Sequence, residues 1–285
     1  MKHFTIGVIG ARTTKFMTVR FDEITLQKYG ITCTTFDLSE LVFRVGKYSD
    51  DDARVVERKA RLKDYTNCSR EPEDKMNALA KISVVIDDFI EEYQLDCVTL
   101  RCWEELQPIF GIAPCVLLSE LNDRGITAAC EVDLCSAINM YSMQLASQTP
   151  ATCLDWNNNY GSDPDKVILF HCGPVPQSLM TEKGTVTDHK MFSKNCPGCG
   201  WGSNEGRIAA FDFTYSNCKT EDGKLTVPAV AESEYHGAYV VGYTDGTFGP
   251  DRDMTRSEAA TIFARLLAQK NGERITSPTT ATFPD

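Results

Sequence analysis

Apolar runs of strand length alternate with longer amphipathic segments from residue 4 to residue 171. The apolar runs predict strands at 4–11, 31–38, 95–103, 126–133, 151–156 and 165–171. The amphipathic segments predict helices at 20–30, 49–65, 71–93 and 133–148. This alternation is typical of an α/β fold with a mainly parallel, doubly wound sheet and helices on both faces. In such a sheet, ligands bind beyond the carboxyl ends of the strands.

The pattern changes after residue 204. The stretch 205–232 predicts a β-hairpin that turns at Asp222-Gly223. Further on, Thr255 and Glu258 form a capping box in front of apolar residues at helical spacing. The sheet is therefore expected to be followed by a hairpin segment and then by a small helical module.

Charge and composition narrow the partners and the compartment. A formal net charge of -11 with no basic run argues against a nucleic-acid partner. The longest apolar runs are too short to span a bilayer, and the N-terminal stretch is typical of a first strand rather than a signal peptide. Both observations favour the cytoplasm.

The cysteines favour the same compartment. Many of the 12 sit in or beside apolar segments, where they pack as small apolar residues: Cys97, Cys102, Cys115, Cys130, Cys135, Cys153 and Cys172. The motif Cys196-x-x-Cys199 has no second pair at zinc-ribbon spacing, and its glycine-rich surroundings indicate a loop. We expect a structural or incidental role for it.

Functional-looking side chains follow several of the predicted strands. Trp103, Glu131, Asp155 and His171 each lie at or just after a strand end, so one sheet edge could bring them together. Asp133 directly precedes a predicted helix and is a natural N-cap, whereas glutamate is not a preferred cap residue. Glu131 is therefore the better candidate for a chemical role.

Two carboxylates and an imidazole form a hard donor set that suits Mn²⁺ or Mg²⁺. A carboxylate beside such an ion can move a proton while the ion polarises a substrate carbonyl and hydroxyl. Glu131, Asp155 and His171 thus have the chemistry needed to move hydrogen between adjacent carbons of a sugar.

The segments around these residues carry a family resemblance. "CVTLRCWEEL", "CEVD", "LDWNNN" and "FHCG" occur in order, and the stretch 4–232 resembles the L-fucose isomerase family. The resemblance implies Mn²⁺-dependent aldose–ketose isomerisation through an enediol, with Mg²⁺ as the alternative ion. It implies metal binding and proton transfer by Glu131 and by Asp155, which lies 24 residues further on. It also implies a sugar site lined by Trp103, His171, Trp156 and Asn157.

The resemblance further implies a partial enzyme. Residues 1–184 correspond to the second domain and the metal-site part of the family, and residues 185–232 to the start of its C-terminal β region. The family's third metal ligand is a histidine beyond that point, so the isomerase is expected to be truncated at both ends. Intact members of the family form homo-oligomers.

Residues 233–285 resemble a partial S-layer homology module. The resemblance rests on Gly242-Tyr243, the Asp245-Gly246-Thr247-Phe248 turn, Pro250-Asp251 and Thr255-Arg256-Ser257-Glu258. It implies attachment to cell-wall polysaccharide, with Arg256 touching the polymer, and hence the cell surface as the alternative location. A gene fusion, two joined reading frames or a remnant would each account for the combination.

Two functions therefore compete. If active, the chain is an intramolecular oxidoreductase that interconverts an aldose and a ketose. The alternative is a non-catalytic, wall-associated carbohydrate-binding protein whose α/β part serves only as a scaffold.

Overall fold

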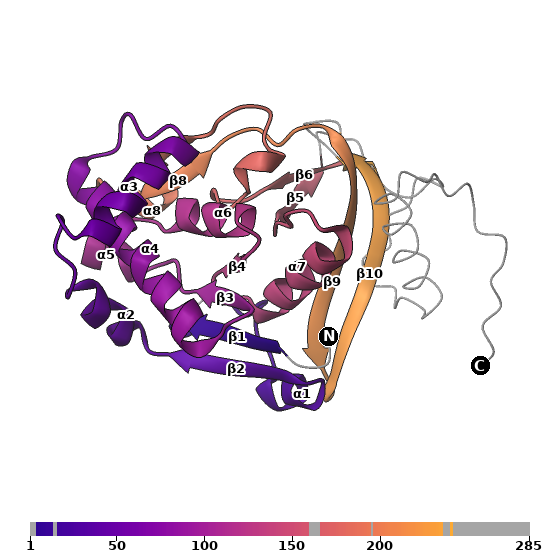
Figure 1. Cartoon of the computed structure of the whole chain (residues 1–285). Helices are drawn as coiled ribbons and strands as arrows, with labels where there is room; N and C mark the ends of the chain where they lie inside the picture. Colours follow the sequence, from indigo (N-terminus) through magenta and orange to yellow (C-terminus); the bar gives the residue numbers. More distant parts are fainter. Residues whose placement is uncertain (1–3, 14–15, 160–165, 195, 236–239, 242–285) are drawn as a thin grey trace, which may run out of the picture.

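A four-stranded parallel sheet forms the centre of the computed structural model, which describes residues 4–13, 16–159, 166–194, 196–235 and 240–241 (Figure 1). The strand order is β2-β1-β3-β4. The strands are β1 (Phe4–Ile9), β2 (Ile31–Phe36), β3 (Cys97–Leu100) and β4 (Thr127–Cys130). Every residue of β3 and β4 is buried, as expected for parallel strands that are covered on both faces.

Helices cover both faces of this sheet. One core joins it to residues of α2 (Leu38–Val45), α4 (Glu73–Tyr93) and α6 (Cys115–Asp123). A second core, on the other face, includes residues of α1 (Glu23–Lys28) and α7 (Leu134–Ser147). The predicted α/β class is therefore confirmed. The short α5 (Leu106–Phe110) follows β3, and α3 (Ala53–Tyr65) packs on α4.

One part of the predicted topology is wrong. Strands β5 (Asp155–Asn159) and β6 (Lys166–Phe170) pair antiparallel and belong to a second sheet, in the order β5-β6-β11-β10-β9. Only residues 160–165 connect them, whereas a parallel crossover needs a dozen residues or more. Their apolar runs indicated strands correctly, but hydrophobicity says nothing about the direction of pairing.

The predicted hairpin is confirmed. Strands β9 (Phe211–Glu221) and β10 (Lys224–Tyr235) turn at Asp222-Gly223, where both residues have positive φ angles. The hairpin runs beside α7 (Figure 1), and the Asn139 side-chain amide donates a hydrogen bond of 2.7 Å to the Ser216 carbonyl. The second sheet also contains the short β11 (Val240–Val241).

Smaller elements complete the described chain. Strands β7 (Thr185–Asp188) and β8 (Trp201–Glu205) pair antiparallel, and β8 contacts α6. Between them lies α8 (Lys190–Ser193), and a 3₁₀ turn, η1 (Gln177–Leu179), precedes β7. The helix predicted after Thr255 lies outside the described residues.

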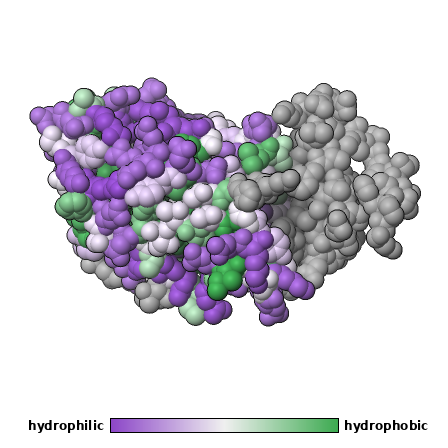
Figure 2. Space-filling model, turned by 60° about the horizontal axis from the view of Figure 1, so that its bottom comes forward, coloured by the Kyte–Doolittle hydropathy of each residue, from purple (hydrophilic) through white to green (hydrophobic). Residues whose placement is uncertain are grey.

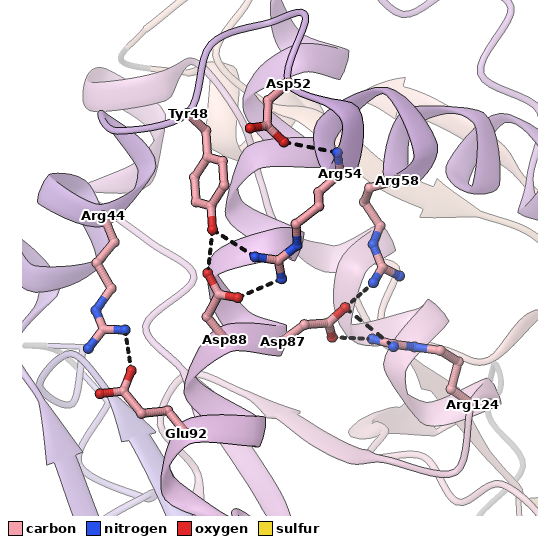
Figure 3. A network of polar contacts seen from close by, with 9 residues as sticks. All are labelled: Arg44, Tyr48, Asp52, Arg54, Arg58, Asp87, Asp88, Glu92 and Arg124. Carbon is pink, nitrogen blue, oxygen red and sulfur yellow. Dashed lines mark hydrogen bonds and ion pairs between the residues drawn. The ribbon is translucent and has the colours of Figure 1, made fainter.

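Ion pairs fix the outer helices to α4. Figure 3 shows guanidinium groups from α2, from α3 and from Arg124, which directly follows α6, pointing at carboxylates on α4. Asp87 accepts from Arg58 and, at 2.7 Å, from Arg124. The neighbouring pairs are Arg54 with Asp88 and Arg44 with Glu92. Burial and the nearby Arg124 charge lower the pKa of Arg58.

Glu120 on α6 is the most deeply buried carboxylate of this network, with 2% of its surface exposed. Its two oxygens lie 2.6 Å from Arg61 Nε, 3.0 Å from Arg124 Nε and 3.5 Å from Arg58 Nη1. Burying a carboxylate is costly unless cations and hydrogen-bond donors surround it. Glu120 thus binds α3 to α6 through charge as well as packing.

The surface is mostly polar on the face seen in Figure 2, where hydrophobic side chains form separate small patches. Several large apolar side chains are exposed on the described part of the chain, including Ile24 and Phe43. No helix among the described residues is both long and apolar enough to cross a bilayer.

Candidate functional site

Glu131 sits at a sharp bend directly after β4. Both Glu131 and Val132 have left-handed backbone angles, with φ of 60° and 59°. That conformation costs free energy for any residue with a Cβ atom and is rarer still for a β-branched one. The side chain of Val132 is buried in the core next to α7, which holds the bend in place.

Because of the bend, we expect a glycine substitution at Val132 to cost less stability than one at another buried valine. Val132→Gly loses a buried side chain but relieves about 1–3 kcal/mol of backbone strain. Val98→Gly in β3 loses an equally buried valine and relieves no such strain. In urea unfolding we expect Val132→Gly to be less destabilising than Val98→Gly by about 1–3 kcal/mol. Equal losses would show that the bend stores no strain.

Asp133 begins α7, as predicted. Its Oδ1 accepts the Ser136 backbone N–H at 2.9 Å, and its Oδ2 accepts the Ser136 hydroxyl at 2.6 Å. Burial raises the pKa of the Asp133 carboxyl, although the hydrogen bonds from Ser136 act in the opposite direction. The two carboxylates of the Glu131-Val132-Asp133 stretch therefore differ in their surroundings, and Asp133 is engaged as a cap.

His171 lies close to two of the predicted site carboxylates. Its Nε2 is 3.6 Å from Glu131 Oε1 and 4.0 Å from Asp155 Oδ2. The antiparallel pairing explains this position, since Asp155 opens β5 opposite Phe170, the residue before His171. The side chain of His171 is 2% exposed, that of Glu131 14% and that of Asp155 56%. The cluster thus runs from the interior to the surface.

The charge of His171 depends on these neighbours. Burial disfavours the imidazolium, but Glu131, Cys172 and Asp155 together outweigh burial and raise its pKa to about 9. Burial also raises the pKa of Asp155, with the nearby His171 acting in the opposite direction. Both ring nitrogens of His171 are buried and make no hydrogen bond within the described structure.

The raised pKa of His171 predicts a pH dependence of stability. An imidazole with a pKa of 6.5 when unfolded and about 9 when folded stabilises the fold fully below pH 6.5. This contribution, on the order of 3 kcal/mol, is lost as pH rises through 9. We expect urea midpoints of metal-free protein to fall over this range, and those of His171→Gln to fall much less. Identical profiles would contradict the ion pairing.

The donor set fits a divalent cation. Ligand atoms about 2.1 Å from one ion lie roughly 3–4.2 Å apart, and the two distances from His171 Nε2 fall in that interval. The ring nitrogens of His171 are buried and make no hydrogen bond within the described structure, which suits a metal ligand. Glu131, His171 and Asp155 could therefore hold a hard ion.

Two thiols adjoin this donor set. Cys130 precedes Glu131, Cys172 follows His171, and ligand atoms of all four residues lie within 4.8 Å of one another. The sequence pattern indicated only that these cysteines lie in the core. Each of them is the chain neighbour of a candidate ligand at a strand end, and this position could have indicated that they lie at the site.

The predicted sugar-contacting residues lie in different surroundings, and not all of their side chains are described. Trp103 packs edge-on against Phe16 at 5.1 Å and Phe192 at 6.3 Å between ring centroids. Trp156 directly follows Asp155, is half-exposed and meets Tyr215 edge-on. Asn157 belongs to β5, but its side chain lies outside the described residues, as does the whole of Arg256.

The cysteines divide into two groups. The loop motif closes on itself in a Cys196–Cys199 disulfide. The other ten are free thiols, among them all seven that were expected to pack in or beside apolar segments.

Comparison with known proteins gives two separate likenesses. The chain is 26% identical over 180 residues to the sulfoquinovose isomerase of Priestia megaterium. The aligned residues make up 63% of this chain and 40% of that enzyme. The sulfoquinovose isomerase of Alkalicoccus urumqiensis is 26% identical over 183 residues, covering 64% of the chain and 41% of the enzyme. The chain thus spans about two fifths of the length of these sugar isomerases, to which its similarity is distant.

The second likeness lies at the other end. The S-layer homology domain family matches residues 225–260, so its match begins within β10 and before the expected boundary at residue 233. Cell surface glycoprotein 1 of Acetivibrio thermocellus is 48% identical over 54 residues, which are 18% of this chain and 2% of that protein.

Proposed function

We propose that the chain carries part of a metal-dependent aldose–ketose isomerase of the L-fucose isomerase type. The observation that supports this best is the position of His171 Nε2, 3.6 Å from Glu131 and 4.0 Å from Asp155. The distant similarity to sulfoquinovose isomerases supports a sugar as substrate. Because those enzymes are much longer than this chain, the activity of the whole enzyme is part of the proposal.

Mn²⁺, or alternatively Mg²⁺, would be held by Glu131 and Asp155 with His171 beside them. When bound, it would supply Lewis acidity toward oxygens on adjacent sugar carbons. The Glu131 carboxylate takes the proton from C2 of the aldose and returns it to C1 after the enediol forms. Asp155, whose pKa burial raises, carries the hydroxyl proton from the C2 oxygen to the C1 oxygen.

Aromatic and polar residues around this cluster would orient the sugar. Trp156 is half-exposed and directly follows Asp155, and apolar C–H faces of sugars pack on aromatic rings. Trp103, Asn157 and His171 complete the proposed sugar-contacting set. In this proposal His171 stands beside the two metal-binding carboxylates and also contacts the sugar.

We further propose a division into residues 1–184, residues 185–232 and an S-layer homology module at 233–285. The match to that family supports attachment of the module to cell-wall polysaccharide, with Arg256 as the polymer contact. The module favours the cell surface as the location, whereas the isomerase part alone favours the cytoplasm. A wall-bound carbohydrate-binding protein without turnover is the rival function.

Turnover and wall binding can be tested on the same purified chain. With Mn²⁺ in heavy water, we expect sulfoquinovose, L-fucose or D-arabinose to give a ketose that carries solvent deuterium, as followed by NMR. Absence of ketose from all three sugars, together with no thermal shift by Mn²⁺, would exclude the isomerase. Cosedimentation with purified cell-wall polysaccharide tests the rival, and it should weaken for Arg256→Ala but not for the control Lys270→Ala.

A further inference from the structure

Four buried thiols gather next to the proposed isomerase site. Cys102 follows β3, Cys115 begins α6, Cys130 ends β4 and Cys172 follows β6. All four side chains are buried in the same core, on the side of the sheet that α4 and α6 cover. Residues far apart in the sequence thus bring four sulfur atoms to one place.

Sulfur contacts connect these thiols. Cys115 Sγ and Cys172 Sγ are 3.7 Å apart. Cys130 Sγ and Cys172 Sγ lie within 4.8 Å of each other, and hydrogen bonding with Cys102, Cys115 and Cys172 raises the pKa of the Cys130 thiol. Two thiolates bound tetrahedrally to one Zn²⁺, each about 2.3 Å from it, are roughly 3.8 Å apart. The distance between Cys115 and Cys172 already matches that geometry.

We infer that Cys102, Cys115, Cys130 and Cys172 form a closed, four-thiolate site for a soft divalent cation such as Zn²⁺. The set is complete, because structural zinc sites use four protein ligands and leave no position open. The neighbouring carboxylate and imidazole donors favour harder ions such as Mn²⁺, so the two sites would select different metals.

The ion would act as a structural cross-link. It would join the ends of β3, β4 and β6 to the first residue of α6. Glu131 and His171 are the chain neighbours of Cys130 and Cys172, so the cross-link would position both of them. Through these neighbours a structural ion would set the distance between residues of the site beside it.

Two alternative explanations for the thiol cluster lead to different experimental results. Cys115 and Cys172 could form a disulfide with a small movement, which would release two protons and pass two electrons to a peroxide. Alternatively, the four thiols could simply fill the core as small apolar groups. Neither fate requires a metal.

The test uses the full chain, purified without chelators from zinc-containing medium. We expect one zinc ion per chain by elemental mass spectrometry, and only sulfur neighbours at about 2.3 Å by X-ray absorption. Exchange with Co²⁺ should give the intense thiolate-to-cobalt charge-transfer absorption of a tetrahedral site.

Variants separate this site from its neighbour. Cys115→Ser with Cys172→Ser should remove the cobalt absorption, whereas Cys97→Ser, an equally buried cysteine within β3, should retain it. Glu131→Gln should also retain it, even where isomerase activity is lost. The absorption therefore reports on the thiols whether or not the isomerase proposal holds.

Several results would overturn the inference. The first is purified protein that holds no zinc and gives no cobalt absorption after metal exchange. The second is oxygen or nitrogen neighbours around the zinc. The third is a Cys115–Cys172 disulfide in unreduced peptide maps. If the double serine variant does not fold, the X-ray absorption of the unmodified protein decides the question alone.

Discussion

Glu131→Gln is expected to lower the turnover of an aldose to its ketose by a factor on the order of 10²–10⁴. The amide has nearly the same shape as the carboxylate but cannot accept the sugar proton. Because Glu131 also stands 3.6 Å from His171 Nε2, the variant should weaken Mn²⁺ binding as well. Calorimetric titration with Mn²⁺ and the rate of deuterium incorporation at saturating Mn²⁺ separate the two effects.

Asp133→Asn is the matched control for this variant. Asparagine is as good an N-cap as aspartate, so the bonds to Ser136 that begin α7 should largely persist. We expect its turnover to stay within a few-fold of the unmodified chain. Full activity in Glu131→Gln would contradict the assignment of Glu131, and a loss of equal size in Asp133→Asn would mean that the bend as a whole is responsible.

Glu120→Gln should have the largest effect on stability, a loss of about 3–5 kcal/mol in the free energy of unfolding. The amide keeps the volume of the side chain but removes the charge that Arg58, Arg61 and Arg124 surround. Arg58 and Arg124 then share Asp87 as their remaining carboxylate, and the half-exposed Arg61 loses its partner. Urea denaturation followed by circular dichroism measures the loss.

Glu73→Gln is the control for the charge change. Glu73 lies 2.6 Å from Lys59 Nζ, but its side chain is 62% exposed. Exposed ion pairs contribute about 0–1 kcal/mol because water and salt screen them. Similar losses in Glu73→Gln and Glu120→Gln would show that burial of the Glu120 network adds nothing.

The sequence predicted most of the parallel sheet because its elements have clear hydrophobic patterns. The long helix at 71–93 and the strand at 4–11 were both found, within two residues at most of their ends. Helix α6 was missed because it is short and because its polar residues, among them Ser119 and Glu120, are buried together with its apolar ones. The pattern of polar and apolar positions therefore does not mark a solvent-facing side.

The sequence predicted that one sheet edge could bring Trp103, Glu131, Asp155 and His171 together, whereas in the structure these residues lie in or after strands of two sheets. Glu131 and Asp133 could be told apart because capping preferences are local, and the hydrogen bonds of Asp133 confirm its part. The approach of His171 to Asp155 depends on the antiparallel pairing of β5 with β6, which the sequence did not predict. The thiol cluster was beyond prediction because its members come from four separate elements. The chemical roles of Glu131 and Asp155 stay predictions.

The sites at the end of β4 lie at the interface between the two sheets. Glu131 follows β4 of the parallel sheet, whereas Asp155 opens β5 of the other sheet and His171 directly follows its strand β6. Under the proposal, a cation bound by both sides would add its binding free energy to the docking of one sheet on the other. Binding and folding are then thermodynamically linked, so a substitution far from the metal that loosens the docking also weakens its affinity.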